Sequence, residues 1–538
     1  MRYSFFPKMR RWQPNANVHR KNQKGAITLL TAFLFIIFAA LGMGMLYVSH
    51  IYLKISGYKA NAMLLEYAAE NGVKQGFHEF LGILAGQSSP RILSEEEVDI
   101  LRQDSLCGGT AIMDILFGVA RPTYASSWER MRWESRIDWF LNQVVSEEAY
   151  FRTDFFIQIQ SRGELENFRA AKETSLELGM ATVTGIVPLA QFPMLLDQNL
   201  TPDEITNFIQ DNPIEIFLPS PNSIPPQILT TEETILPVSA TPQLGKALNI
   251  KLFQPDALTT AQLREALGLE VSSDPVPSGV YLIQDDTGLG GIFVQGDCEK
   301  IILAIEGESQ IISFIQDELE WTLIFCPAQR ITKFITPEET RLFNHTPIGI
   351  ILVNGAVQSL GGGIRDTSGK VEIVKDEEIP CILDGVNLTI ICSDEIVLSS
   401  HLILQGVKWE EGVPYVKDSS AMLNIFSSGQ DLIDGTEKNG RIVVDEKAPQ
   451  EIKIQASLTA SDLGFAIEGE NKTVHLLGSL QTSDYTSSGN ALKAIWDERF
   501  LDQDELLANT PRSAKPVLAM LYLRASVWSD KTDTHDDL

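Results

Sequence analysis

The stretch GAITLLTAFLFIIFAALGMGMLYV (Gly25–Val48) runs for 24 residues without a charged side chain. A helix rises about 1.5 Å per residue, so a helix of this length crosses the roughly 30 Å hydrocarbon core of a bilayer with some tilt. The stretch therefore predicts one membrane-spanning helix over residues 26–48.

The flanks of the apolar stretch indicate its type and orientation. Secretory signal peptides have a shorter apolar region, about 7 to 15 residues, followed by a small-residue cleavage site. Here the chain continues as SHIYLKISGYKANAMLLEYAAENGVKQGF. The positive-inside rule places the basic leader, residues 1–25, in the cytoplasm and the rest outside. The leader's basic residues are Arg2, Lys8, Arg10, Arg11, Arg20, Lys21 and Lys24.

Beyond the membrane segment the helix is expected to continue. Apolar and small residues recur at helical spacing on one face, which is typical of an amphipathic helix. They are Ile51, Ile55, Tyr58, Ala62, Leu65, Ala69 and Val73. The sequence thus predicts one helix of about 50 residues, half in lipid and half packed on a soluble domain.

Charge divides the chain sharply. The net charge is -28 over 538 residues, yet no Asp or Glu occurs from Met1 to Leu65. The part beyond Glu66 is therefore strongly acidic, which argues against nucleic acid as a partner because phosphate neutralisation needs clustered Lys and Arg. The length is that of two or three domains.

The N-terminal stretch resembles a known family. The junction KGAITLLTAF and the later Ala68-Ala69-Glu70-Asn71-Gly72 are similar to type IV pilin-like proteins, and most of all to minor pilins of the PilX kind and the pseudopilin GspK of type II secretion. The resemblance covers about residues 21–77. It implies a bacterial inner-membrane protein that a prepilin peptidase cuts between Gly25 and Ala26, with Lys24 closing the leader. It also implies packing with other pilin-like subunits through the helix.

One position departs from the main filament subunits of that family. Those carry Glu as the fifth residue after the cut, whereas this chain has Leu30, so the resemblance implies a minor role. Lateral packing in lipid favours small residues, and the candidates for helix assembly are Ala39, Ala40, Gly42 and Gly44. The alternative is a permanent single-pass anchor that is not cleaved.

Residues 49–200 are expected to hold the helix continuation and a mixed, mostly helical domain. The segment SSWERMRWESRIDWFLNQVVSEEAYF places apolar residues near helical spacing, with charged residues between them. The following FRTDFFIQIQSRGEL alternates apolar and polar residues, which predicts a strand.

Proline then changes the pattern. TPDEITNFIQ carries a helix-start signature with Thr201 as the cap, Pro202 in the first turn and Glu204 completing the box. Seven prolines lie between residues 213 and 242, which predicts an extended linker or surface wrap over residues 201–245. A short helical connector, residues 246–278, follows with DALTTAQLREALGL.

Residues 279–511 read as a β-rich domain, which makes the fold class α+β. Short strands rich in Ile, Val and Leu are separated by Gly, Asn, Asp and Ser. The repeating form favours coils of a parallel β-helix, a solenoid, and a β-sandwich is the alternative. Residues 512–538 are predicted to be a C-terminal strand, which caps or pairs with the β-rich domain, and an acidic tail.

The five cysteines show no metal-ligand spacing, and buried free thiols are the simplest interpretation. A Cys381–Cys392 or Cys298–Cys326 bridge is the alternative in an oxidising compartment. We expect no metal and no cofactor.

No catalytic site is predicted. Asp431, Asp434 and Glu437 form the best local carboxylate cluster, but their spacing fails the Ca²⁺ loop pattern and suits a solvated turn. The seven histidines make no zinc motif. The first hypothesis is therefore a minor pilin-like filament component. The alternative is an anchored adhesin or envelope scaffold with an unknown surface ligand, and an anchored carbohydrate-active enzyme is a remote third.

Overall fold

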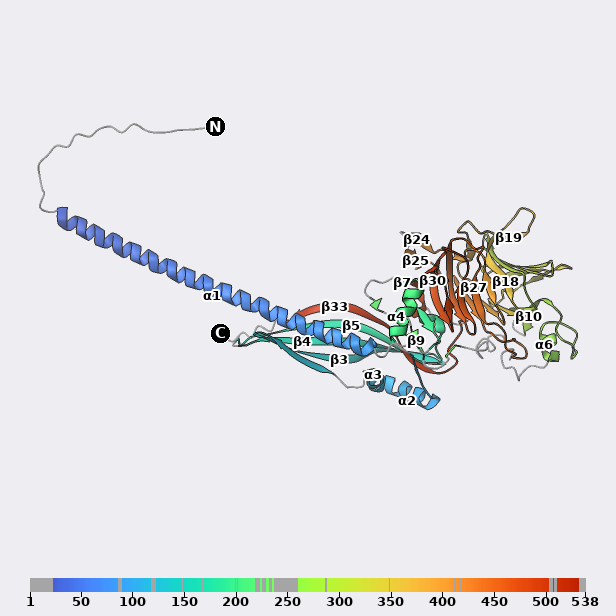
Figure 1. Ribbon diagram of the computed structural model, residues 1–538, viewed down its shortest axis with the longest axis horizontal. Helices are drawn as coiled ribbons and strands as arrows, with labels where there is room; N and C mark the ends of the chain where they lie inside the picture. The colour runs from blue at the N-terminus through green and yellow to red at the C-terminus, as the bar shows by residue number, and fades with distance from the viewer. Residues whose placement is uncertain are drawn as a thin grey trace, which may run out of the picture.

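The computed structural model shows a long helix, a sheet lobe and a large β lobe arranged in a row (Figure 1). We call residues 64–185 with 517–531 the sheet lobe, and residues 187–516 the large lobe. The description covers the chain except residues 1–22, 86–89, 118–121, 148, 167, 199, 201, 218–222, 225–228, 232–234, 237–259, 286–287, 348, 411–412, 417–418, 503–506, 508–509 and 532–538. Most of the predicted leader thus lies outside the described residues.

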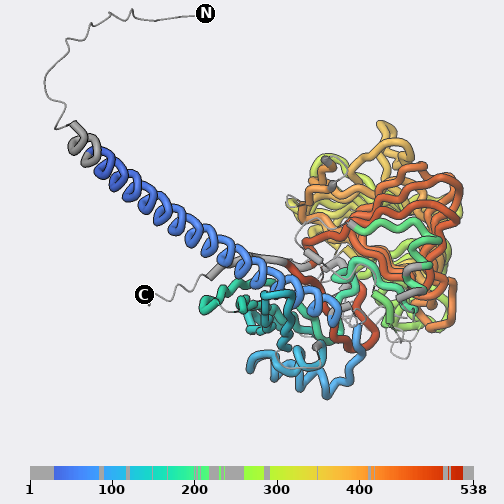
Figure 2. Tube along the Cα trace, turned by 60° about the vertical axis from the view of Figure 1, so that its left-hand side comes forward, coloured from blue at the N-terminus to red at the C-terminus, as the bar shows by residue number. Residues whose placement is uncertain are grey.

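Helix α1 runs without a break from Gln23 to Ala85, 63 residues. The predicted continuation of the membrane segment as one helix is confirmed. Its apolar residues up to Met63 are largely exposed, whereas Leu65, Ala69 and Val73 are buried against the sheet lobe. The helix therefore has a free half and a docked half, and Figure 2 shows the free half projecting away from both lobes.

Two short helices follow α1 in the sheet lobe. Helix α2 (Glu95–Leu106) begins at Ser94, whose side chain and backbone form a capping box with Glu97. Helix α3 (Thr110–Phe117) follows. In its first turn the Ala111 amide donates a hydrogen bond to the Asp104 carboxylate at 2.6 Å. Both helices contribute buried residues to the core under the sheet.

The sheet of this lobe is antiparallel and carries α1 on one face. Its order is β1-β33-β5-β4-β3-β2, with β8 also paired to β33. The strands are β1 (Arg91–Ile92), β2 (Thr123–Trp128), β3 (Met131–Ser146), β4 (Tyr150–Leu165), β5 (Ala171–Gly185), β8 (Ser223–Ile224) and β33 (Val517–Lys531).

The helical prediction for the segment from Ser126 to Phe151 is wrong, because it forms β2, β3 and the start of β4. In β3 the residues Met131, Ser135 and Ile137 are buried, while Arg132 and Arg136 are exposed. That alternation has the period of two expected for a strand with one buried face. The predicted strand over FRTDFFIQIQSRGEL is confirmed as β4.

The large lobe contains two sheets of eleven strands each. The first has the order β10-β11-β17-β21-β26-β28-β30-β32-β7, with β6 and β9 joined beside β30, and is parallel from β11 to β7. Its strands are β6 (Met194–Leu196), β7 (Ile214–Phe217), β9 (Leu229–Thr230), β10 (Gly279–Asp285), β11 (Gly288–Gln295), β17 (Ile350–Asn354), β21 (Asn387–Cys392), β26 (Met422–Ser427), β28 (Glu451–Ala460), β30 (Thr473–Thr482) and β32 (Ala491–Trp496).

The second sheet is parallel over its central strands and antiparallel at one end. Its order is β16-β15-β14-β13-β12-β18-β22-β27-β29-β31, with β19 beside β18. The strands are β12 (Lys300–Glu306), β13 (Ser309–Gln316), β14 (Leu319–Cys326), β15 (Ile331–Ile335), β16 (Thr340–Phe343), β18 (Val357–Arg365), β19 (Val371–Ile373), β22 (Ile396–Leu398), β27 (Arg441–Val444), β29 (Gly464–Ile467) and β31 (Tyr485–Thr486). Two short pairs are β20 (Pro380–Ile382) with β23 (Ile403–Leu404), and β24 (Lys408–Glu410) with β25 (Val413–Tyr415).

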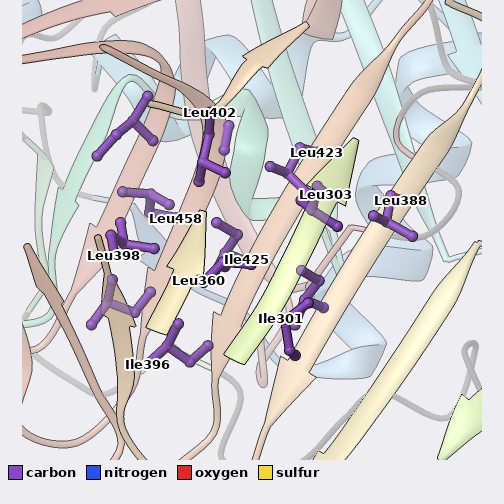
Figure 3. Packing of buried hydrophobic residues seen from close by; sticks show 14 of the residues in the cluster. Ile301, Leu303, Leu360, Leu388, Ile396, Leu398, Leu402, Leu423, Ile425 and Leu458 are labelled. Atoms are coloured by element: carbon purple, nitrogen blue, oxygen red, sulfur yellow. The ribbon is translucent and has the colours of Figure 1, made fainter. Parts of the chain in front are cut away.

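From β21 to β32 the strands of the two large sheets alternate along the chain between one sheet and the other. The inward side chains of both sheets meet in the main core, where Ile301, Leu360 and Ile425 are fully buried (Figure 3). Parallel strands are buried on both faces, which accounts for the nearly continuous Ile, Val and Leu runs in the sequence. The antiparallel strands β13 to β15 bring Phe314, Leu323 and Phe334 into the same core.

Where the structure describes it, the predicted extended linker or surface wrap, residues 201–245, packs on the large lobe. Helix α4 (Pro202–Asp211) forms as expected, although its predicted cap Thr201 lies outside the described residues. The segment then enters the large lobe, because β7 pairs with β32 and β9 pairs with β6. Asp197, just after β6, accepts backbone hydrogen bonds from Ile235 and Leu236. Proline excludes long strands but permits these short ones.

The remaining helices are short. They are the 3-10 turn η1 (Leu189–Gln191), α6 (Thr260–Ala266) and α7 (Arg499–Asp502). Helix α6 lies within the predicted helical connector, and its Leu263 packs with β10 and β11 on the outside of the first sheet.

The C-terminal strand forms, but its predicted partner is wrong. Strand β33 pairs antiparallel with β5 over 13 residue pairs from Val517–Gly185 to Lys531–Glu173, rather than with the β-rich lobe. The large lobe is thus inserted between β5 and β33. At the join the Ser513 amide donates to Val187 and the Leu189 amide donates to Pro511.

Candidate functional site

The free half of α1 is the most apolar exposed surface of the described chain. Among the described residues, α1 is the one helix long and apolar enough to span a membrane, and its most apolar window is entirely exposed. Phe35 and Met45 are each 74% exposed. Such a surface is stable when lipid or another apolar surface covers it.

The predicted assembly residues do not share one face of α1. Ala40 and Gly44 line the same shallow groove with Ile37 and Val48. At about 100° per residue, Ala39 and Gly42 point to other sides of the helix. Gly42 and Gly44 have no heavy atom within 4 Å of where a side chain would begin. The structure therefore brings Ala40 and Gly44 together and separates them from the other two.

The predicted processing residues lie in the first turn of α1. The helix starts at Gln23, so Lys24, Gly25 and Ala26 follow directly within it. Their side chains lie outside the described residues.

The docked half of α1 depends on close approach to the sheet. A β-carbon on Gly163 of β4 would lie 2.5 Å from the Ala69 amide nitrogen and 2.8 Å from the Leu65 carbonyl oxygen. On the helix side, Gly72 faces Ser161, and a β-carbon on Gly76 would lie 2.8 Å from Ile159. These glycines let the helix and sheet backbones approach to a distance that larger residues forbid.

Polar contacts fix the register of this packing. Trp133 of β3 donates its indole N–H to Gln75 of α1 at 2.8 Å, and Lys172 forms an ion pair with Glu66. Sequence reasoning predicted that this half of the helix packs on a soluble domain, but not which residues of the sheet it meets. The small residues spaced four apart at Ala68, Gly72 and Gly76 could have revealed the helix side, but nothing local marks Gly163 as their partner.

The predicted carboxylate cluster stabilises a turn. Asp431 accepts from the amides of Ile433 and Asp434, and also from Asn354 at 3.3 Å. Asp434 accepts from the Thr436 amide. Within the described residues no group of three or more His, Cys, Asp or Glu side chains is placed to hold a metal ion.

Two histidines of the large lobe occupy a mixed surface cluster. His401 is buried, and its Nδ1 accepts the Lys453 amide at 3.0 Å. The Lys453 ammonium lies 5.0 Å from the Trp409 ring and binds Glu378 at 2.6 Å, while His475 contacts the edge of the Trp409 ring. Desolvation by burial lowers the pKa of both His401 and His475.

These depressed pKa values predict a loss of stability in acid. The neutral imidazoles are favoured in the fold, so their contribution is complete above the ordinary histidine pKa of about 6.5 and is lost as pH falls through the lower folded pKa. We expect the thermal midpoint of the large lobe to fall between pH 7.5 and 5, and His401→Gln to flatten that dependence. An unchanged pH profile in His401→Gln would contradict the assignment.

The cysteines are free thiols, and Cys107 is exposed while the other four are buried. Burial raises the pKa of the Cys298 and Cys381 thiols to about 12, which keeps them protonated and unreactive. Neither of the alternative disulfides is present in this structure.

Comparison of the chain with family models, with curated proteins and with solved structures gives no match. The fold and this site define a chain whose N-terminal helix is long and apolar enough to span a membrane and is followed by a large β-rich body.

Proposed function

We propose that this chain is a minor pilin-like structural component of a bacterial type IV pilus or type II secretion-like filament, held in the inner membrane until assembly. Its role is assembly rather than catalysis. The observation that carries the proposal is the division of α1 into two halves, one exposed and apolar and one docked on an antiparallel sheet of the same chain. A plain anchor needs no docked half.

The docked half attaches the helix firmly to the sheet lobe. Buried Val73 and Phe80 join a core with Ile137 and Ile157 from the centre of the sheet. The free half thus leaves the sheet lobe at a defined angle, which lateral packing with equivalent helices requires. Ala40 and Gly44 would form the close contact in lipid, where packing of small residues drives helix association.

The position of the large lobe supports a terminal or rare place in a filament. It is inserted between β5 and β33, at the end of the sheet lobe opposite the free half of α1 (Figure 1). A lobe there occupies the space that a subunit stacked further out would need. Tip, priming or adhesive roles follow from this position.

We also infer that the large lobe is a parallel β-helix. Its strands alternate between two sheets and pair in parallel with the strand one turn away, from β17 to β30 in the first sheet and from β18 to β31 in the second. Each turn buries its inner face only against its neighbours, as in other solenoids. An extracytoplasmic β-helix is suited to binding a ligand on its surface.

The test is processing by a prepilin peptidase. Co-expression with the peptidase is expected to remove residues 1–25, and Gly25→Val should block the cut because a branched side chain replaces the residue at the scissile bond. Gly57→Ala, another glycine of α1 with open space around it, is the matched control and should be processed normally. N-terminal sequencing and mass measurement report the outcome.

A full-length N-terminus in both the parent chain and the Gly57→Ala control would contradict the proposal. That result would favour the alternative, a permanently anchored adhesin or envelope scaffold.

A further inference from the structure

The segment of α1 between the membrane span and the sheet lobe is exposed at every residue except Asn61, which is half-buried. We call residues 49–62 the stalk. Ile51, Ile55 and Tyr58 are 38%, 44% and 63% exposed, and Ala62 is also exposed. At about 100° per residue these four lie within roughly 60° of one another and form one apolar stripe. The stripe continues the face on which Leu65 and Ala69 are buried against the sheet.

Two lysines flank the stripe. Lys54 and Lys59 are exposed and lie about 70° to either side of its centre. An apolar stripe bordered by cations is the arrangement of helices that lie in the headgroup layer, with the lysine stems along the apolar surface and the ammonium groups at the phosphates. No Asp or Glu occurs from Met1 to Leu65, so no acidic side chain of the stalk itself opposes this attraction.

The edge of the sheet lobe nearest the stalk adds an independent observation. Phe168 lies there, with its ring 6.5 Å from that of Tyr58. The β2–β3 turn reaches the same edge, since Glu166 donates its amide to Arg130, and it presents Trp128 at 60% exposure. Exposed Trp and Arg are typical of the membrane–water interface, although Glu129 and Glu166 also lie at this edge.

Length indicates how these parts meet the bilayer. Residues 26–62 span about 55 Å as a helix, whereas a bilayer with its headgroups is about 40–45 Å thick. An upright helix would leave the outer part of the apolar stripe, Tyr58 and Ala62, in water. A helix tilted by about 40°, at the upper end of the observed range, keeps the stalk within the headgroup layer.

We propose that the stalk binds the headgroup layer of an anionic phospholipid bilayer, with the apolar stripe toward the acyl chains, Lys54 and Lys59 at the phosphates, and Trp128 at the same surface. This rests on the membrane insertion of α1 that the proposed function includes. It places the sheet lobe against the membrane surface before assembly, and it predicts that leaving the membrane for a filament requires breaking a lipid contact.

The experiment measures which side of the stalk is shielded. Ile55→Cys and Leu53→Cys, each in a full-length Cys107→Ser chain, are labelled with a fluorophore and placed singly in lipid nanodiscs. Ile55 is in the stripe and Leu53, 69% exposed, lies about 160° away and nearer the membrane span. An upright helix shields position 53 more. The proposal expects an aqueous quencher to reach position 55 at least fivefold less than position 53 in discs containing phosphatidylglycerol.

Charge provides the second arm. Lys54→Gln with Lys59→Gln should reduce the difference in quencher access between positions 53 and 55 to less than twofold. Discs of phosphatidylcholine alone should have the same effect. Lys300→Gln with Lys447→Gln removes the same charge from exposed positions of the large lobe and should change nothing.

The proposal is overturned if the quencher reaches position 55 as readily as position 53, or more readily. It is also overturned if replacing the stalk lysines leaves the difference in quencher access between the two positions unchanged. Shielding of position 55 that appears only with two copies in a disc would also overturn it, in favour of a second chain as the occupant. Resistance to alkaline extraction and removal of the leader are measured in parallel, so failure of insertion or processing is distinguished from failure of the stalk contact.

Discussion

Replacing Gly163 with valine is expected to release the docked half of α1 from the sheet. The new side chain would meet backbone atoms of Leu65 and Ala69, which cannot rotate away. The helix must move outward and lose its contacts with Trp133 and Ile159, at a cost of about 3 kcal/mol. Local opening of the helix then becomes about 100-fold more frequent. Hydrogen exchange of a peptide over residues 64–81, in detergent-solubilised full chain, measures this.

Gly82→Ala is the control for this result. Gly82 lies on the same helix with no heavy atom within 4 Å of the added carbon, so the change should be neutral or stabilise α1 by up to about 1 kcal/mol. If Gly163→Val exchanges at the parent rate, the close approach of helix and sheet is not as described. The consequence for function is direct, because an undocked helix no longer transmits its position in the membrane to the rest of the chain.

Removing the charge of Arg499 is expected to open the join between the two lobes. Arg499 and Asp497 are 3% and 2% exposed, and the guanidinium donates to both carboxylate oxygens. It also donates to the carbonyls of Ser419 and Ala421 at 2.8 and 3.0 Å. Arg499→Met leaves a buried carboxylate and two carbonyls without this donor, which costs about 3–5 kcal/mol.

An exposed pair of the same spacing is the matched control. Glu339, just before β16, forms an ion pair with Arg341 of β16, and both side chains are more than half exposed. Arg341→Met should cost less than about 1 kcal/mol because solvent screens the pair. Hydrogen exchange over residues 419–423 and 494–500 should rise at least 100-fold in Arg499→Met alone. A similar response to both substitutions would show that the buried pair contributes no more than a surface pair.

Arg499 lies where the chain leaves the large lobe and returns to the sheet lobe. Asp497 and Arg499 follow β32, the last described strand of the large lobe, and precede the return of the chain to β33. Trp496 and Phe500 on either side belong to a core shared with Val183 and Val517 of the sheet lobe. The pair therefore fixes the short segment of the large lobe that carries Trp496 and Phe500 into this shared core.

The β2–β3 region illustrates how local pattern can mislead. Ile137, Phe140, Leu141 and Val144 have helical spacing, but MRWESRIDW places charged residues at every second position, and that alternation is what the sheet uses. The choice between the two periods was decided by β4, which pairs with β3 over its whole length. A strand's stability comes from a partner that single-segment reading does not contain.

The sequence by itself determined α1 as one continuous helix, the β4 strand, the helices α4 and α6 and the β-rich character of the C-terminal half. These features depend on interactions within a few residues or on hydrophobic runs, which a linear reading contains. Only the tertiary structure decided that Gly163 meets α1, that β33 returns to β5 and that residues 214–217 complete the first sheet of the large lobe. Those contacts join residues separated by about 90 to 360 positions, and their stability comes from complementary surfaces that exist only after the chain has folded.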